Sequence, residues 1–279
     1  MSIESESDKI LSSADDEILY DENIKRLLGD KSVLARILKG YVFECKDMSY
    51  DEIETCIEGT PEINKRPVDP GMSNSPHITG MNTEDKVPFE GAVYYDVYFY
   101  ILLPGAEKIK IIIDLEAQKR KKQTYDLSER GIFYCARMLS AEQGREFYHS
   151  EYQKLKKVYS IWIAVTDDPD EQNTAVEYTI TEKNLVGHLA NPGRYDLMTV
   201  VIINVSDESI VNAKEGDPLA LHRFIEAIIG KLDVKDKIRI LQDEYGIRMT
   251  SGMEGRLMNM CNLSSSLVEK CRGWTRGLY

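Results

Sequence analysis

Two stretches decide the fold: residues 93–103 (VYYDVYFYILL) and residues 108–118 (KIKIIIDLEAQ). Both are rich in aromatic and β-branched residues, which are the side chains that strands favour. Pro104 and Gly105 follow the first stretch and predict a turn. Together the two stretches predict an antiparallel hairpin with a loop of about five residues.

Helices and strands alternate around this hairpin. Helical spacing or capping residues predict helices over residues 22–28, 30–42, 49–58, 125–139, 145–157, 217–229, 233–245 and 251–262. Further strands are predicted over residues 158–166, 176–181 and 197–205. Residues 59–83 contain four prolines and read as a long loop. This order predicts an α/β sandwich with a mixed sheet.

Composition excludes several classes of protein. The chain has 279 residues, 42% hydrophobic and 29% charged, as in soluble globular proteins. Five cysteines without a CxxC pair argue against a disulfide framework or a zinc ribbon. The four histidines form no metal motif and are expected at the surface. The N-terminus lacks a signal-peptide pattern and no apolar run could span a bilayer, so we expect a cytoplasmic protein without a membrane partner.

Charge is distributed unevenly along the chain. The net charge of −12 argues against nucleic acid as a partner. Residues 105–160, however, carry 12 basic and 8 acidic side chains, a net of +4. They include the run Lys119, Arg120, Lys121 and Lys122. Such a run is either a solvated turn or a contact to backbone phosphates.

The second strand of the hairpin carries acidic residues on one face. Side chains alternate in a strand, so Asp114, Glu116 and Gln118 share the face opposite Ile111, Ile113, Leu115 and Ala117. A half-exposed strand in water would show the same alternation. Asp96, however, is the single charged residue of residues 93–103. A carboxylate in such a strand is expected to be buried and therefore paired or bound to metal.

Carboxylates brought together by the hairpin repel one another unless a cation lies between them. Oxygen ligands favour a hard divalent ion such as Mg²⁺. We expect Asp96, Glu116 and the backbone carbonyl of Ala117 to be its ligands, and Gln118 to orient water or phosphate. An ion of this kind assists phosphodiester hydrolysis.

The chain resembles the PD-(D/E)XK nuclease superfamily, in its branch of recombination-promoting nucleases and transposases. The resemblance rests on NTEDKVPFEGAVYYDVYFY (82–100), IIIDLEAQ (111–118), YDLSERGIFYCARMLS (125–140), YQKLKKVYSIWI (152–163) and MCNLS (260–264). It implies a restriction-endonuclease-like core, with a central mixed β-sheet flanked by helices, over residues 20–210. Residues 1–19 are expected to be loose, and residues 211–279 to form a helical C-terminal region.

The resemblance also implies roles for single residues. Asp96 and Glu116 match the two acidic positions of the family motif, although Tyr95 stands where the motif has proline. Gln118 stands where the superfamily usually has lysine. An amide cannot serve as a cation or as a general base at neutral pH, so the resemblance leaves the base unassigned.

Further residues of the same region have implied roles. Glu90 and Asp114 are additional candidates for metal coordination. Arg130 and Tyr134 match the helix after the acidic strand, where we expect Arg130 to contact phosphate and Tyr134 to pack. The basic residues 119–122 are expected to contact DNA.

Two classes of function remain open at this point. The first is an endonuclease that hydrolyses DNA with Mg²⁺ or Mn²⁺ and acts in transposition or recombination. The second is a weakly active or inactive protein of the same fold that binds DNA or a protein partner. A further reading is self-association of the chain through its C-terminal helices, giving a homo-oligomer.

Overall fold

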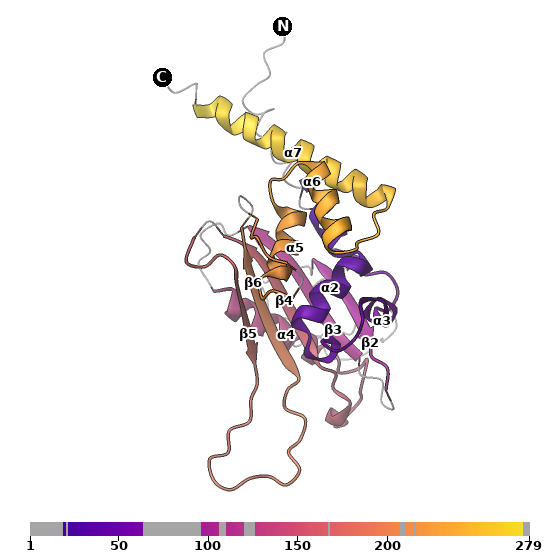
Figure 1. Cartoon of the computed structure of the whole chain (residues 1–279). Helices are drawn as coiled ribbons and strands as arrows, with labels where there is room; N and C mark the ends of the chain where they lie inside the picture. Colours follow the sequence, from indigo (N-terminus) through magenta and orange to yellow (C-terminus); the bar gives the residue numbers. More distant parts are fainter. Residues whose placement is uncertain are drawn as a thin grey trace, which may run out of the picture.

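The computed structural model describes residues 19–20, 22–63, 96–105, 110–119, 126–166, 168–206, 210–214 and 216–275, with the backbone alone for residues 62, 110–119 and 264–275. Six strands of this part form one mixed sheet in the order β1-β2-β3-β4-β6-β5 (Figure 1). They are β1 (Glu62–Ile63), β2 (Val97–Leu102), β3 (Lys110–Lys119), β4 (Val158–Val165), β5 (Thr174–Thr179) and β6 (Met198–Val205). The predicted α/β class is confirmed.

The hairpin predicted from the aromatic and isoleucine-rich stretches is present. β2 and β3 pair antiparallel, from Val97 opposite Leu115 to Leu102 opposite Lys110. β3, β4 and β6 then run parallel, and β5 returns antiparallel to β6. β1 pairs with β2 at residues 62–63. The predicted loop over residues 59–83 was therefore wrong at residues 62 and 63, because a strand of two residues is too short to show a periodic pattern in the sequence.

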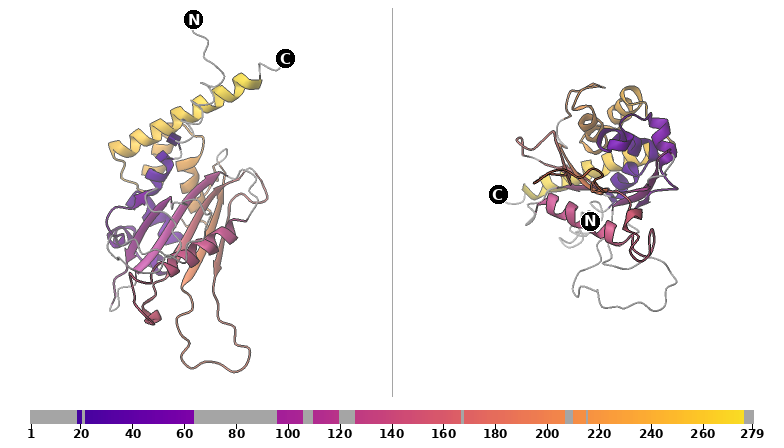
Figure 2. Two further views of the ribbon diagram at one scale, coloured as in Figure 1. Left: turned by 180° about the vertical axis from the view of Figure 1, so that it is seen from behind. Right: turned by 90° about the horizontal axis from the view of Figure 1, so that it is seen from below.

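Helices cover both faces of the sheet. Odd-numbered residues of β4 and β6, such as Ile161 and Val201, pack into one large apolar cluster; even-numbered residues, such as Trp162 and Val200, pack into a smaller one. The large cluster is covered by helix 22–28, α2 (Lys31–Tyr41), η1 (Phe43–Cys45), α3 (Tyr50–Cys56), α5 (Ala220–Ile229), α6 (Val234–Arg239), η4 (Ile240–Glu244) and α7 (Ser251–Thr275). α4 (Leu127–Ser140) covers the smaller cluster, on the opposite face (Figure 2).

α4 lies unusually close to the sheet because of one glycine. A Cβ atom at Gly131 would collide with Val200 and would come within 3.0 Å of Trp162 Nε1. The absence of a side chain at this position lets the helix backbone approach β4 and β6. The neighbouring residue Arg130 is thereby held against the same surface.

The cap expected at Asp30 is present, the structure adds a capping box at Ser49, and the helix start expected at Asp217 was wrong. Asp30 caps α2, and Ser49 forms a capping box with Glu52 at the start of α3. Asp217 and Pro218 were expected to begin α5, but this helix begins at Ala220. The Asp217 carboxylate instead accepts a hydrogen bond of 2.7 Å from the Lys214 backbone, so it closes a turn before the helix.

The helix predicted over residues 145–157 was also wrong. This segment is a series of turns with one short 3-10 helix, η3 (Tyr152–Lys154). Its backbone has positive φ at Gly144 and His149. Glu142, buried at the end of α4, accepts a hydrogen bond of 2.7 Å from the Lys156 backbone. This long-range bond closes the segment as a loop, against its helical spacing.

One histidine differs from the prediction. His222 on α5 is buried, and its Nε2 atom lies 3.1 Å from the carbonyl oxygen of Thr174. Its burial follows from the packing of α5 between the sheet and the C-terminal helices, which the local sequence does not reveal. His149 and His188 are exposed, as expected. His77 lies outside the described residues.

The C-terminal helices are continuous with the main core. Met253, Leu257 and Met260 of α7 belong to the same cluster as Leu27 and Leu28 near the N-terminus. Figure 1 shows α7 lying across one end of the molecule. No helix in the described part of the chain has the length and hydropathy needed to cross a membrane.

Candidate active site

The start of β2 and the second half of β3 bring two of the predicted residues to the same level of the sheet. The last register pair of these strands joins Val97 to Leu115. One step further, the same register places Asp96 opposite Glu116. Directly opposed residues of an antiparallel pair have Cα atoms about 4.5–5.5 Å apart. Continuation of this register by one residue would make Asp96 and Glu116 cross-strand neighbours.

Within the described ranges, β3 pairs with β4 further along the strand than it pairs with β2. In the described ranges the ladder with β2 ends at Leu115, whereas the ladder with β4 continues to Lys119. Residues 116–119 thus pair with β4 on one side, and no described strand pairs with them on the other side. Ala117 and Gln118 both fall in this stretch.

Asp96 is buried beside a lysine that the sequence analysis did not single out. Asp96 is 8% exposed at the bend before β2, and its Oδ1 atom lies 2.6 Å from Lys25 Nζ. Lys25 is 9% exposed and comes from helix 22–28. The expectation that a carboxylate here would be buried and paired is met, and the partner found in the structure is an ammonium group.

A sequence signal for Lys25 did exist. Residues Ile24, Lys25 and Leu28 fall on one side of a helix with 3.6 residues per turn. Lys25 is therefore a charged residue on the apolar stripe of its helix, where an unpaired ammonium would be costly. The helix alone could not reveal which carboxylate lies opposite.

Arg130 stands on the face of the sheet that α4 covers, above the strand next to β3. Its guanidinium lies 4.9 Å from the centre of the Trp162 ring and donates a 2.7 Å hydrogen bond to the Tyr134 hydroxyl. Trp162 is the register partner of Glu116 in the β3–β4 ladder. The predicted helix therefore carries Arg130 to the strand position beside Glu116, and Tyr134 is buried, as expected for a packing residue.

The structure describes the remaining predicted residues only in part. The backbone sets Asp114 opposite Tyr98 and Lys119 beside Val165, at the end of β3. The side chains of β3 are outside the described part of the chain, and so are all of Glu90, Arg120, Lys121 and Lys122. The roles assigned to these residues remain predictions.

The donor set fits a hard divalent cation. Asp96 and Glu116 would both supply carboxylate oxygens, which Mg²⁺ and Mn²⁺ prefer over nitrogen or sulfur. The buried Asp96 carboxylate already lies against a positive charge, that of Lys25. Among the side chains that are described, no cluster of three or more acidic, histidine or cysteine groups occurs. A site would thus combine Asp96 with groups of β3.

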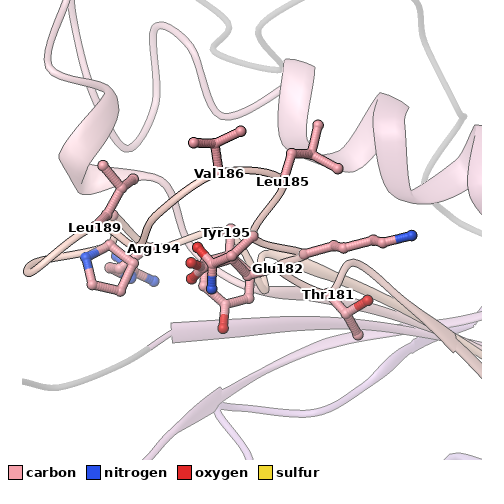
Figure 3. Close-up of a pocket in the computed structure, with 11 residues that line it drawn as sticks. Thr181, Glu182, Leu185, Val186, Leu189, Arg194 and Tyr195 are labelled. Carbon is pink, nitrogen blue, oxygen red and sulfur yellow. The ribbon is translucent and has the colours of Figure 1, made fainter.

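A pocket of about 580 Å³ lies elsewhere, in the segment that joins β5 to β6 (Figure 3). Its lining includes Leu185, Val186 and Arg194. This segment leads into Met198, which lies in register with Val158 and, through it, with Ile112. Glu116 is four residues further along β3, about 13 Å at 3.3 Å per residue. The pocket and the Asp96–Glu116 pair are separate.

Comparison with known proteins gives one match. The model of a family described as PD-(D/E)XK nuclease family transposase matches residues 96–250, more than half of the chain. The matched segment begins at Asp96 and includes β3, α4 and β4. No curated protein and no solved structure matches the chain.

Proposed function

Since the chain belongs to the PD-(D/E)XK nuclease family transposases, we propose that it is a Mg²⁺- or Mn²⁺-dependent DNA endonuclease acting in transposition or recombination. The observation that carries this proposal is the β2–β3 register, which, continued by one residue beyond the Val97–Leu115 pair, would set Asp96 opposite Glu116. Two opposed carboxylates at the end of a hairpin, beside the guanidinium of Arg130, are suited to a metal ion and a phosphodiester.

In this proposal Asp96, Glu116 and the Ala117 carbonyl hold the metal ion, with Glu90 and Asp114 as additional candidates. A bound divalent ion would offset the charge on the phosphate and make a bound water more acidic. Asp96 is fixed for this task by its contact with Lys25, and Glu116 by its place in the β3–β4 ladder.

Other residues would bind and orient the DNA. Arg130 presents a planar fork of donors, and its stacking on Trp162 restricts the rotation of the guanidinium. Gln118 can both donate and accept hydrogen bonds, so it can orient water or a phosphate oxygen, but it carries no charge. The basic run at residues 119–122 would contact backbone phosphates next to the site.

A protein that binds DNA without cutting it is the competing function. Two observations favour it: Gln118 is a neutral residue, and Lys25 already pairs with Asp96. Such a protein would bind DNA equally well with and without divalent metal. It would leave a supercoiled plasmid intact at every metal concentration.

We also propose that the C-terminal helices mediate self-association. Removing everything after Lys231 would test this poorly, because Met253 and Leu257 belong to the main core. Truncation after Leu263 spares these contacts. Sedimentation velocity should then show fewer chains per particle than in the full-length protein, and circular dichroism should lose only the helical signal of the removed end of α7. The same number of chains per particle in the truncated and the full-length protein would refute the proposal.

Incubation with supercoiled plasmid tests the nuclease. A covalently closed circle has no ends, so its conversion to nicked or linear DNA requires endonuclease activity. We expect conversion with Mg²⁺ or Mn²⁺ and none with EDTA. Retention of the closed circle in both metals, together with metal-independent binding to the same DNA, would favour the competing function.

A further inference from the structure

We propose that Lys25 is a positioning residue of the active site. Its ammonium group holds the carboxylate of Asp96 in place, so that helix 22–28 supports the site. This proposal rests on the proposed nuclease function. Lys25 lies before the segment that the family model matches, residues 96–250, so the family match assigns it no role. The observation behind this proposal is the contact of Lys25 Nζ with Asp96 Oδ1 at 2.6 Å, in which both side chains are about nine-tenths buried.

Asp96 is outside the described part of the β2–β3 ladder. Asp96 lies in a bend, one residue before β2, and the β2–β3 ladder ends at the neighbouring pair Val97 and Leu115. Side-chain contacts therefore contribute to where the carboxylate lies. The ammonium of Lys25 makes one of these contacts.

Lys25 is itself held firmly. Its helix is anchored in the main apolar cluster by Ile24, Leu27 and Leu28. These neighbours flank Lys25 along the helix and restrict the movement of its stem. An ammonium fixed in this way can set the orientation of a carboxylate to within a small angle, which metal coordination requires.

Charge gives a second reason for the contact. Asp96 and Glu116 are opposed across the hairpin, and Asp114 lies two residues before Glu116. Three acidic residues so close repel one another, and a neighbouring ammonium offsets part of that repulsion. A carboxylate has two oxygens and several acceptor sites. Contact of Lys25 with Oδ1 is therefore compatible with a metal ion on the same carboxylate.

Stability alone is a weak explanation for this pair. Desolvating two charges costs about as much as their attraction returns, so a buried ion pair contributes little compared with apolar residues of the same size. The chain contains a second pair of this type that serves as a control. Lys157, also buried, lies 2.9 Å from Glu44, next to the start of β4 and away from Glu116.

The experiment compares Lys25→Met, Lys25→Arg and Lys157→Met in the full-length protein. Plasmid nicking gives kcat and KM, calorimetric titration gives the Mn²⁺ affinity, and thermal melting reports folding. We expect Lys25→Met to lower kcat at least about 30-fold, within the range for lost supporting contacts at a metal site, with KM for DNA nearly unchanged. Lys25→Arg keeps a charged donor and should retain most of the activity. Lys157→Met should melt earlier with unchanged kcat.

A double variant shows whether Lys25 acts through Asp96. Residues that work as one unit have non-additive effects. Adding Lys25→Met to Asp96→Asn should therefore cause no loss of kcat beyond that of Asp96→Asn alone. We also expect Mn²⁺ to bind Lys25→Met no more tightly than wild type, because disorder of Asp96 outweighs the removal of a nearby positive charge.

Two results would overturn the positioning role while leaving the nuclease function in place. One is a Lys25→Met protein that melts earlier but keeps the kcat of wild type, as Lys157→Met is expected to do. The other is tighter Mn²⁺ binding with undiminished cleavage, which would make Lys25 a competitor of the metal. Wild-type protein that fails to nick DNA at all would overturn the nuclease function and this role together.

Discussion

The guanidinium of Arg130 lies 4.9 Å from the centre of the Trp162 ring, and Trp162 is the register partner of Glu116. A positive charge is thereby held above the strand next to the acidic residues of β3. Stacking on an aromatic ring orients a guanidinium without consuming all of its hydrogen-bond donors. This relationship makes Arg130 the best placed described residue for contact with a DNA phosphate.

Substitution of Arg130 by glutamine is expected to weaken DNA binding about tenfold. The loss of one phosphate contact should also reduce the slope of log affinity against log salt by about 0.9. Fluorescence anisotropy with Ca²⁺, measured at several salt concentrations, would give both values. Arg137→Gln is the matched control, because Arg137 is on the same helix but stacks on the exposed ring of Phe133. An unchanged salt slope for Arg130→Gln would contradict the assigned contact.

Gly131→Ala is expected to destabilise the protein by about 1–3 kcal/mol, as overpacking of a tight contact does. The added methyl group would push α4 away from Val200 and Trp162, and Arg130 with it. Gly255→Ala, in open space on α7, should instead stabilise the fold by about 0.5–1 kcal/mol. Chemical denaturation measures both changes. Equal effects of the two substitutions would refute the close approach of α4.

Stability should fall between about pH 4.5 and pH 7 because of Glu142. Burial raises the pKa of this carboxyl to about 7 in the folded protein, above its ordinary value. In that window the folded chain binds more protons than the unfolded chain, so the free energy of unfolding decreases as pH rises. The decrease is at most about 1.4 kcal/mol per pH unit. Glu142→Gln should remove this contribution, as measured by denaturation at pH 5 and pH 8. The same pH dependence in both proteins would contradict it.

The Lys25–Asp96 pair should show strong coupling in stability. Either Lys25→Met or Asp96→Leu alone removes one charge of the buried pair and is expected to cost about 3–5 kcal/mol. The double variant removes both charges and should recover most of that loss. Denaturation of the four proteins in the cycle provides the measurement. Additive losses in the double variant would mean that the two side chains do not interact in solution.

The hairpin and its acidic pair could be predicted from sequence because both depend on local patterns. Aromatic and β-branched residues specify the two strands, and alternation puts Asp114 and Glu116 on one face. An antiparallel register follows from the short connection between the strands. The helix that carries Arg130 was predictable for the same reason, since its apolar spacing extends over four turns.

The contacts that complete the site are long-range and could not be predicted in this way. Lys25 meets a carboxylate 71 positions later in the chain, and nothing near Lys25 specifies that partner. The stacking of Arg130 on Trp162 likewise depends on how closely α4 approaches the sheet, which Gly131 sets. His222 and the segment around Glu142 were predicted wrongly because tertiary packing overrode their local patterns.

The most direct test of the central claim is plasmid nicking by Asp96→Asn and Glu116→Gln. Both substitutions keep the size of the side chain and remove its charge. Glu177→Gln, on the exposed edge strand β5, is the control. We expect metal-dependent nicking by wild type and by Glu177→Gln, and a loss of at least about 100-fold in the other two variants. Cleavage that survives both substitutions would contradict the assignment of Asp96 and Glu116 as the metal-binding pair.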